Sequence, residues 1–163
     1  RHRHLLRARL RTRISNRHPL ERTRTGIFRV NRTIEVTGHR RGLHEITAMV
    51  SDVVRDAGFE EALCTVFLKH TSAGVCIQEN ADPSARRDME AWFDRIAPED
   101  EPWYTHVDEG SDDMPSHLKA ILTGTAISIP VVDGRLALGT WQGVYLCEFR
   151  DRPSTRRIVV MVR

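Results

Sequence analysis

Residues 126–138 read AISIPVVDGRLAL, which places two short apolar runs on either side of the dipeptide Asp133-Gly134. An Asp-Gly pair between apolar runs is the strongest short-range cue for a β-hairpin, because both residues tolerate the positive φ angles of a tight turn. The stretch therefore predicts two antiparallel strands. Two more β-rich runs follow at residues 144–149 and 156–162, with a turn at residues 153–154 between them.

Upstream of this hairpin, three segments place apolar side chains at helical spacing: residues 43–57, 83–98 and 114–124. The first is followed by Gly58, a residue suited to the left-handed conformation that ends a helix. Asp82 precedes Pro83 and Asp113 precedes Met114-Pro115, so we expect both aspartates to cap the helices that follow them.

The remaining β-rich runs are residues 27–36, 62–68 and 75–77. Strands thus lie on both sides of three helices, without the regular alternation that builds parallel sheets. We predict an α+β fold, a single compact domain with a largely antiparallel sheet and about three helices.

Charge divides the chain into two parts. Residues 1–24 hold nine arginines and one acid, Glu21, a net charge of +8, whereas the other 16 basic and 21 acidic residues give −5. We expect residues 1–25 to be a disordered Arg-rich extension and residues 26–163 to be the folded domain. Such an extension can also bind nucleic acid or serve as a transit peptide, but we do not expect nucleic acid as the partner.

The three cysteines, Cys64, Cys76 and Cys147, are odd in number, far apart and embedded in apolar runs. This pattern is typical of reduced core thiols in a cytoplasmic protein rather than of a disulfide framework. No apolar run approaches the ~20 residues that cross a bilayer, so we expect a soluble protein without a membrane partner.

Most residues that could do chemistry lie in the region 69–148. His70, His106 and His117 fall there, beside seven carboxylates between residues 99 and 113. Imidazole and carboxylate are the usual ligands of Zn²⁺ and similar ions. The histidine intervals of 36 and 11 residues match no named zinc motif, so histidines that only form hydrogen bonds in polar loops are an equal alternative.

Six short motifs occur in order along the chain: His70-Thr71-Ser72-Ala73, Glu79-Asn80-Ala81-Asp82-Pro83, Ala97-Pro98-Glu99-Asp100, Trp103-Tyr104-Thr105-His106, Asp112-Asp113-Met114-Pro115-Ser116-His117-Leu118-Lys119 and Leu138-Gly139-Thr140-Trp141-Gln142-Gly143. Together with Glu148 they resemble the YjbQ family, also called UPF0047 and labelled secondary thiamine-phosphate synthase. The resemblance covers about residues 26–163 and leaves out the Arg-rich extension.

The resemblance implies a compact α+β domain that forms a homotrimer, with sites near the subunit contacts. It also implies weak thiamine-phosphate synthase activity, in which a hydroxymethylpyrimidine diphosphate joins a thiazole phosphate with loss of pyrophosphate. The alternative is a trimeric protein that binds a metal or a small metabolite and whose catalysis is incidental.

Diphosphate departure needs its negative charge neutralised by a cation or by hydrogen-bond donors. We therefore assign catalysis to His70, Glu79, His106 and His117. A divalent metal, Mg²⁺ or Zn²⁺, is expected on His70, His106, His117 and Asp112. A small phosphorylated metabolite is expected to bind through hydroxyl, amide, indole and ammonium groups, namely those of Thr71, Ser72, Asn80, Lys119, Thr140, Trp141 and Gln142.

Overall fold

The computed structural model describes residues 13–14, 21–22 and 28–163, which form ten strands and three helices. The strands are β1 (Arg13–Ile14), β2 (Glu21–Arg22), β3 (Phe28–His39), β4 (Gly42–Glu45), β5 (Ala62–Leu68), β6 (Ala73–Glu79), β7 (Ala126–Val132), β8 (Arg135–Leu136), β9 (Gln142–Glu148) and β10 (Ser154–Val162). The helices are α1 (Thr47–Ala57), α2 (Pro83–Ile96) and α3 (Asp113–Thr123). The α+β class and the three helices expected from the sequence are confirmed.

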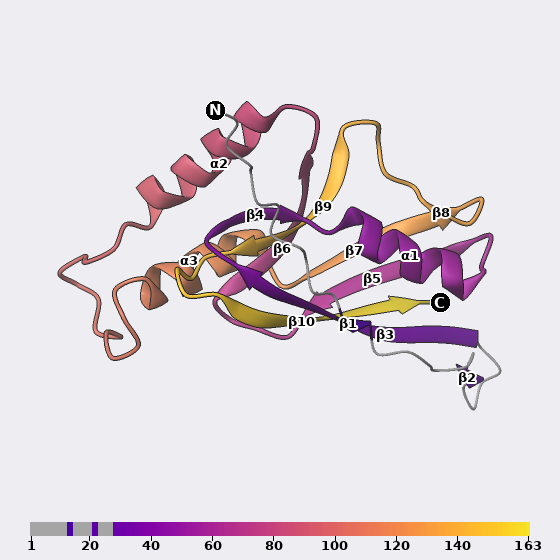
Figure 1. Ribbon diagram of the computed structural model, residues 1–163, viewed down its shortest axis with the longest axis horizontal. Coiled ribbons are helices and arrows are strands. Elements are labelled where there is room, and N and C mark those ends of the chain that lie inside the picture. Colours follow the sequence, from indigo (N-terminus) through magenta and orange to yellow (C-terminus); the bar gives the residue numbers. More distant parts are fainter. Residues whose placement is uncertain (1–12, 15–20, 23–27) are drawn as a thin grey trace, which may run out of the picture.

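Two antiparallel sheets carry the fold (Figure 1). The seven-stranded sheet has the order β1-β3-β10-β5-β7-β8, with β2 also paired to β3, and the three-stranded sheet has the order β4-β9-β6. The predicted hairpin joins β7 to β8 through a two-residue loop, because Val132 pairs with Arg135. Asp133 and Gly134 both have positive φ, 51° and 70°, as a type I′ turn requires.

The small sheet is apolar on both faces because it lies between two layers. Along β9, Val144 and Leu146 belong to the core shared with the large sheet and α1, whereas Tyr145 and Cys147 belong to a second cluster with Phe93 of α2. Side chains alternate between the faces of a strand, so a strand covered on both sides becomes a continuous apolar run. This explains why residues 143–148 are all buried.

Helix α3 is held close to β6 at a glycine. A Cβ at Gly74 would lie 1.7 Å from Thr123 Oγ1, a separation at which no side chain fits. The Val75 N–H also donates to Gly124 O, the residue after the helix, at 3.0 Å. The backbone contact at the end of α3 therefore fixes the helix, and with it the side chains of its first turns, against the small sheet.

The element boundaries correct two sequence predictions. Residues 43–45, predicted as the start of a helix, pair with β9 as β4, and α1 begins only at Thr47. Gly58 does end α1 in the left-handed conformation, and Asp82 caps α2 by accepting the Ser84 N–H at 2.7 Å. Asp113 does not cap α3: it lies in the first turn, after Asp112.

The expectation for residues 1–25 falls mostly on residues outside the described ranges; Arg13–Ile14 and Glu21–Arg22 pair with β3. All three cysteines are free thiols, as expected. Burial raises the pKa of Cys64 to about 11, which keeps this thiol protonated and unreactive at neutral pH.

Candidate functional site

Two histidines and an aspartate converge where the loop after α2 meets α3. His106 Nε2 lies 2.8 Å from Asp113 Oδ2, and His117 Nε2 lies 3.3 Å from the same oxygen. Asp113 and His117 are four residues apart on α3 and therefore share a face of the helix. One nitrogen of each imidazole and one carboxylate oxygen all lie within 4.8 Å of one another. In a tetrahedral zinc site the ligand atoms lie about 3.4 Å from one another, so the two imidazoles would have to move by about 1 Å or more for the three atoms to bind one ion.

The hydrogen bond on the far side of His117 fixes its tautomer. His117 Nδ1 lies 2.9 Å from Thr71 O, and because a carbonyl oxygen only accepts, Nδ1 carries a proton. A neutral His117 then points its Nε2 lone pair at Asp113 Oδ2. Two lone pairs facing each other need a proton or a metal ion between them. A backbone carbonyl that orients an imidazole in this way is the usual support of a metal-binding histidine.

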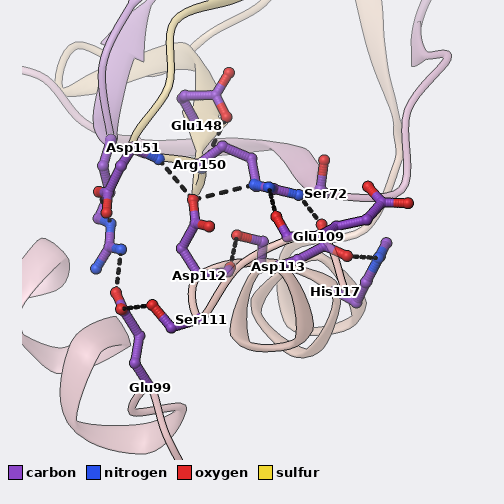
Figure 2. A network of polar contacts seen from close by, with 12 residues as sticks. Ser72, Glu99, Glu109, Ser111, Asp112, Asp113, His117, Glu148, Arg150 and Asp151 are labelled. Carbon is purple, nitrogen blue, oxygen red and sulfur yellow. Dashed lines mark hydrogen bonds and ion pairs between the residues drawn. The ribbon is translucent and has the colours of Figure 1, made fainter. Parts of the chain in front are cut away.

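Arg150, in the turn between β9 and β10, anchors the aspartates at the start of α3 (Figure 2). Its guanidinium donates to Asp113 Oδ1, to Asp112 Oδ2 at 3.0 Å and to Glu109 O at 2.8 Å. Asp113 is almost fully buried, with 2% exposed. Its second oxygen is therefore left to the two histidines, and its carboxylate has little freedom to turn away.

Asp112 faces the other way in Figure 2, toward Arg150 and Asp151. Burial would raise the pKa of Asp112, but the hydrogen bond from the Asp151 N–H, at 2.9 Å, and the charge of Arg150 outweigh it and lower the pKa. Asp112 is thus an ionised partner of Arg150, whereas Asp113 occupies the position beside the histidines that the sequence analysis gave to Asp112.

Two depressions lie near this constellation, and the first of them reaches His106. One, of about 320 Å³, lies in the loop and is lined by Tyr104, His106 and Met114 among others. A second, of about 680 Å³, lies beside Asp112, Arg150 and Arg152. His106 is itself half exposed. A small metabolite could therefore approach the His106 imidazole from solvent through the first depression.

His70 lies close to this constellation but is turned toward β10. Its Nε2 accepts the Arg157 N–H at 2.9 Å. Burial and the charge of Arg156 lower the pKa of His70, which favours a neutral ring with its proton on Nδ1. The carbonyl of the next residue, Thr71, contacts His117. The His70 Nε2 itself is hydrogen-bonded to the backbone of β10, so His70 is not in the same cluster as the other two histidines.

A buried ion pair between Arg156 and Glu148 lies near the first residue of β6. Arg156 donates to Glu148 through Nε at 2.7 Å and Nη2 at 2.5 Å, and to Ser72 Oγ at 3.2 Å. Glu148 is 1% exposed and Arg156 is 5% exposed. Ser72 is thus already engaged in a structural contact, whereas the neighbouring Thr71 is exposed. Glu148 belongs to a structural ion pair in this chain.

The other group of predicted residues lies at the opposite end of β6. Ala73 pairs with Glu148, whereas Glu79 pairs with Gln142, and six residue steps of a strand span about 20 Å. Within one chain, the residues around Glu79 and the histidines near the start of β6 therefore form two separate groups.

Several polar groups at the Glu79 end bond to one another. Glu79 Oε1 accepts the Asp82 N–H at 3.0 Å, and Gln142 Oε1 accepts the Gly139 N–H at 2.8 Å. Asn80 donates to Glu45 at 3.2 Å. The second oxygen of Glu79 is buried and has no hydrogen-bond partner among the residues that the structure describes. Thr140 and Trp141 are exposed, the indole by 64%, so Trp141 does not pack in the sheet.

Lys119, predicted to bind substrate, is buried instead. Its side chain is 2% exposed and its ammonium donates to Asp94 of α2 at 2.7 Å. The reason is helical geometry, because Lys119 follows the buried Ser116 and Pro115 by three and four residues and so shares their inward face of α3. It ties α3 to α2 rather than facing the loop.

The sequence reasoning counted Asp113 among several carboxylates that could hold a metal but chose Asp112, and it missed Arg150 altogether. For Asp113 a signal was present: an aspartate four residues before a histidine at a helix start places both on one face. For Arg150 there was none, because its contact with Asp113 spans 37 residues and depends on the turn between β9 and β10.

These features define a small α+β protein that carries a His-Asp-His constellation of the metal-ligand type at a loop-helix junction. The chain belongs to the YjbQ/UPF0047 family, because the family model described as UPF0047 protein YjbQ-like matches residues 32–163. A UPF0047 protein of Synechocystis is 48% identical over 122 residues, which cover 75% of this chain and 83% of the relative. The UPF0047 protein YjbQ of Salmonella typhimurium is 41% identical over 81% of this chain and 96% of its own.

Solved structures support the same assignment. A conserved protein of this family from Clostridium acetobutylicum superposes with a TM-score of 0.74 at 34% identity, covering 80% of this chain and 98% of that one. A YbjQ-like protein of unknown function from Sulfolobus solfataricus gives 0.73 at 26% identity, with 82% and 96% covered. Among the described residues, no helix is long and apolar enough to cross a membrane.

Proposed function

We propose that the protein holds a divalent metal ion on His106, Asp113 and His117 and acts there on a small phosphorylated metabolite. The observation that carries the proposal is the convergence of the two Nε2 atoms on Asp113 Oδ2 while the Thr71 carbonyl holds the His117 Nδ1 proton. This arrangement leaves a lone pair directed at a carboxylate, which a cation relieves.

The donor set favours zinc or a similar transition ion over magnesium. Two imidazoles and one carboxylate form the ligand set of catalytic zinc sites, in which a fourth position is left to water or substrate, whereas Mg²⁺ prefers oxygen ligands. The half-exposed His106 and the depression beside it supply such an open side.

The charge around the site supports a cation-dependent phosphate site. Seven carboxylates lie between residues 99 and 113, and Arg150 is already paired with two of them. An anionic substrate would be repelled by this surface alone. A bound divalent ion supplies the positive charge that neutralises a phosphate or a departing diphosphate.

The reaction that we propose for this site is thiamine-phosphate synthase chemistry, the joining of a hydroxymethylpyrimidine diphosphate to a thiazole phosphate. Thr71 offers an exposed hydroxyl next to His117. His70 offers a neutral ring with a proton on Nδ1 that can be donated to a substrate oxygen. These groups bind and orient the anionic substrate beside the histidines.

Metal binding is tested on protein stripped with a chelator and then titrated with Zn²⁺ or Mg²⁺. We expect one zinc ion per chain, lost in His106→Ala and His117→Ala and retained in His70→Ala, which is the matched control because its ring is turned to β10. A wild-type protein that binds neither ion would overturn the proposal.

The reaction is tested by pyrophosphate release and thiamine phosphate formation from the two half-substrates, with and without metal. Turnover that needs the ion and disappears in His106→Ala supports the enzyme. Stoichiometric metal binding without turnover supports the second candidate, a metal- or metabolite-binding protein, which is favoured by the separation of Glu79 from the histidines by about 20 Å of strand.

A homotrimer would remove this separation if the Glu79 end of one copy met the histidine end of the next. Exposed apolar side chains on the helices, such as Trp92 (51%) and Ile121 (77%), are suited to a subunit contact. Co-expression of Glu79→Gln with His106→Ala tests this directly. With shared sites, about one quarter of all sites in randomly assembled trimers combine two intact halves, so activity returns; with separate sites it does not.

A further inference from the structure

Arg41, in the bend between β3 and β4, contacts three carboxylates from three different segments. Its guanidinium reaches Asp94 of α2 at 3.3 Å, Asp151 of the β9–β10 turn at 2.9 Å, and Glu99 of the loop that carries His106. The planar guanidinium of arginine points its N–H groups in several fixed directions and can contact several carboxylates at once. The compact ammonium group of lysine lacks this geometry.

Each of these three contacts continues to α3 or to the loop just before it. Asp94 also accepts from Lys119, two residues after His117. Glu99 accepts a hydrogen bond from Ser111 Oγ (Figure 2), over 2.7 Å.

The contact of Arg41 with Asp151 leads, through further hydrogen bonds, to the candidate metal ligand Asp113. The Asp151 N–H donates to Asp112, which accepts from Arg150, and Arg150 holds Asp113. Arg41 touches none of the three candidate ligands, yet α2, the loop 97–112 and the β9–β10 turn, which all contact the region of the ligands, are tied to it.

The balance of charge at Arg41 agrees with this geometry. Burial alone would lower the pKa of Arg41, but the hydrogen bond to Glu99 and the charges of Asp151, Glu99 and Asp94 outweigh it and raise the pKa. The pKa of Glu99 is lowered, first by the hydrogen bond from Arg41 and then by that from Ser111. Isolated surface ion pairs contribute little, but a network of several charges can hold a geometry.

We propose that Arg41 is the positioning residue of the His106–Asp113–His117 constellation: it holds the loop 97–112 and the first turns of α3 in the arrangement that brings the three groups together. That the constellation holds a metal ion rests on the proposed function. The positioning role itself concerns the chain alone and is measurable without metal.

The experiment compares Arg41→Ala, Arg41→Lys and a matched control, Arg32→Ala. Arg32 also forms an ion pair, with Asp56 at 2.7 Å, but its partner lies on α1. Amide hydrogen exchange of metal-free protein is measured across residues 97–117, and zinc affinity is measured by competition with a chelating dye. Unfolding temperature is recorded for each variant.

We expect Arg41→Ala to speed exchange in residues 97–117 by about tenfold relative to the rest of the chain and to weaken zinc binding by about 10- to 100-fold, as loss of outer partners of a metal site does. Arg41→Lys should fall between, and Arg32→Ala should change neither.

Unchanged exchange in that segment, or a uniform loss of protection with unchanged affinity, would overturn the positioning role. A wild type that binds no zinc would instead remove the metal ion from the proposal, while the exchange comparison would still decide the role of Arg41.

Discussion

The buried pair between Glu148 and Arg156 offers a prediction whose magnitude follows from burial. Replacing Glu148 with Leu leaves Arg156, a residue that is 5% exposed, with Ser72 as the sole hydrogen-bond partner of its guanidinium among the described residues. Removing one member of a buried ion pair costs about 3–5 kcal/mol, because the other charge remains buried and uncompensated. A chain of this length has a stability on the order of 10 kcal/mol, so the variant remains folded but much weaker.

The double variant Glu148→Leu with Arg156→Met is expected to be more stable than either single variant. Both charges are gone, and the remaining cost is that of the hydrogen bonds lost by Ser72 and by the Arg150 N–H, about 1 kcal/mol each. The two substitutions are therefore strongly non-additive.

Urea unfolding at pH 7 measures the effect. With a slope of about 2 kcal/mol per molar urea, each single variant should lower the midpoint by about 2 M and the double variant by about 1 M. Arg157→Met is the control, because Arg157 lies next to Arg156 on β10 but makes an exposed pair with Glu35, worth under about 1 kcal/mol. Additive losses in the double variant would refute the reasoning.

Three further predictions concern single positions. Gly74→Ala should destabilise by about 1–3 kcal/mol, since its Cβ would lie 1.7 Å from Thr123 Oγ1, and Thr123→Ala should recover part of the loss in thermal unfolding. Because the pKa of His70 is lowered by folding, its contribution to stability is complete above its ordinary value of 6.5 and is lost as pH falls through the folded value. Urea titrations from pH 7.5 to 5 should show this loss in the wild type and less of it in His70→Gln. Trp141→Ala should leave the unfolding temperature unchanged, because the indole is 64% exposed; a clear drop would place Trp141 in the packing of the sheet.

The parts of the fold that the sequence predicts are those decided by neighbouring residues. The turn at Asp133-Gly134 needs only two residues with positive φ, and the cap at Asp82 needs only its own side chain and the next backbone amides. The start of α1 was predicted too early because Leu43 and Ile46 fit helical spacing. In the structure, Leu43 pairs with Cys147 of β9, more than 100 residues later, and this strand pairing decides the conformation.

The sequence predicts which residue types form the candidate site, but it does not predict which of these residues lie together. His106 and His117 meet through a loop whose path no periodicity describes, and the partner of His70 is a backbone N–H on β10. The Glu79 motif and the histidine motif look like neighbours in sequence, yet β6 carries them to opposite ends. Strand direction, which a single sequence does not reveal, separates them.

The two adjacent aspartates show how finely the site depends on where α3 begins. Asp113 lies in the first helical turn, so its carboxylate shares a face with His117 one turn later. Asp112 lies one residue earlier, about 100° around the helix axis, and therefore faces Arg150 and the Asp151 N–H. A shift of the helix start by one residue would exchange these environments. Because Arg150 binds both aspartates at once, it fixes the start of the helix and thereby decides which carboxylate meets the histidines.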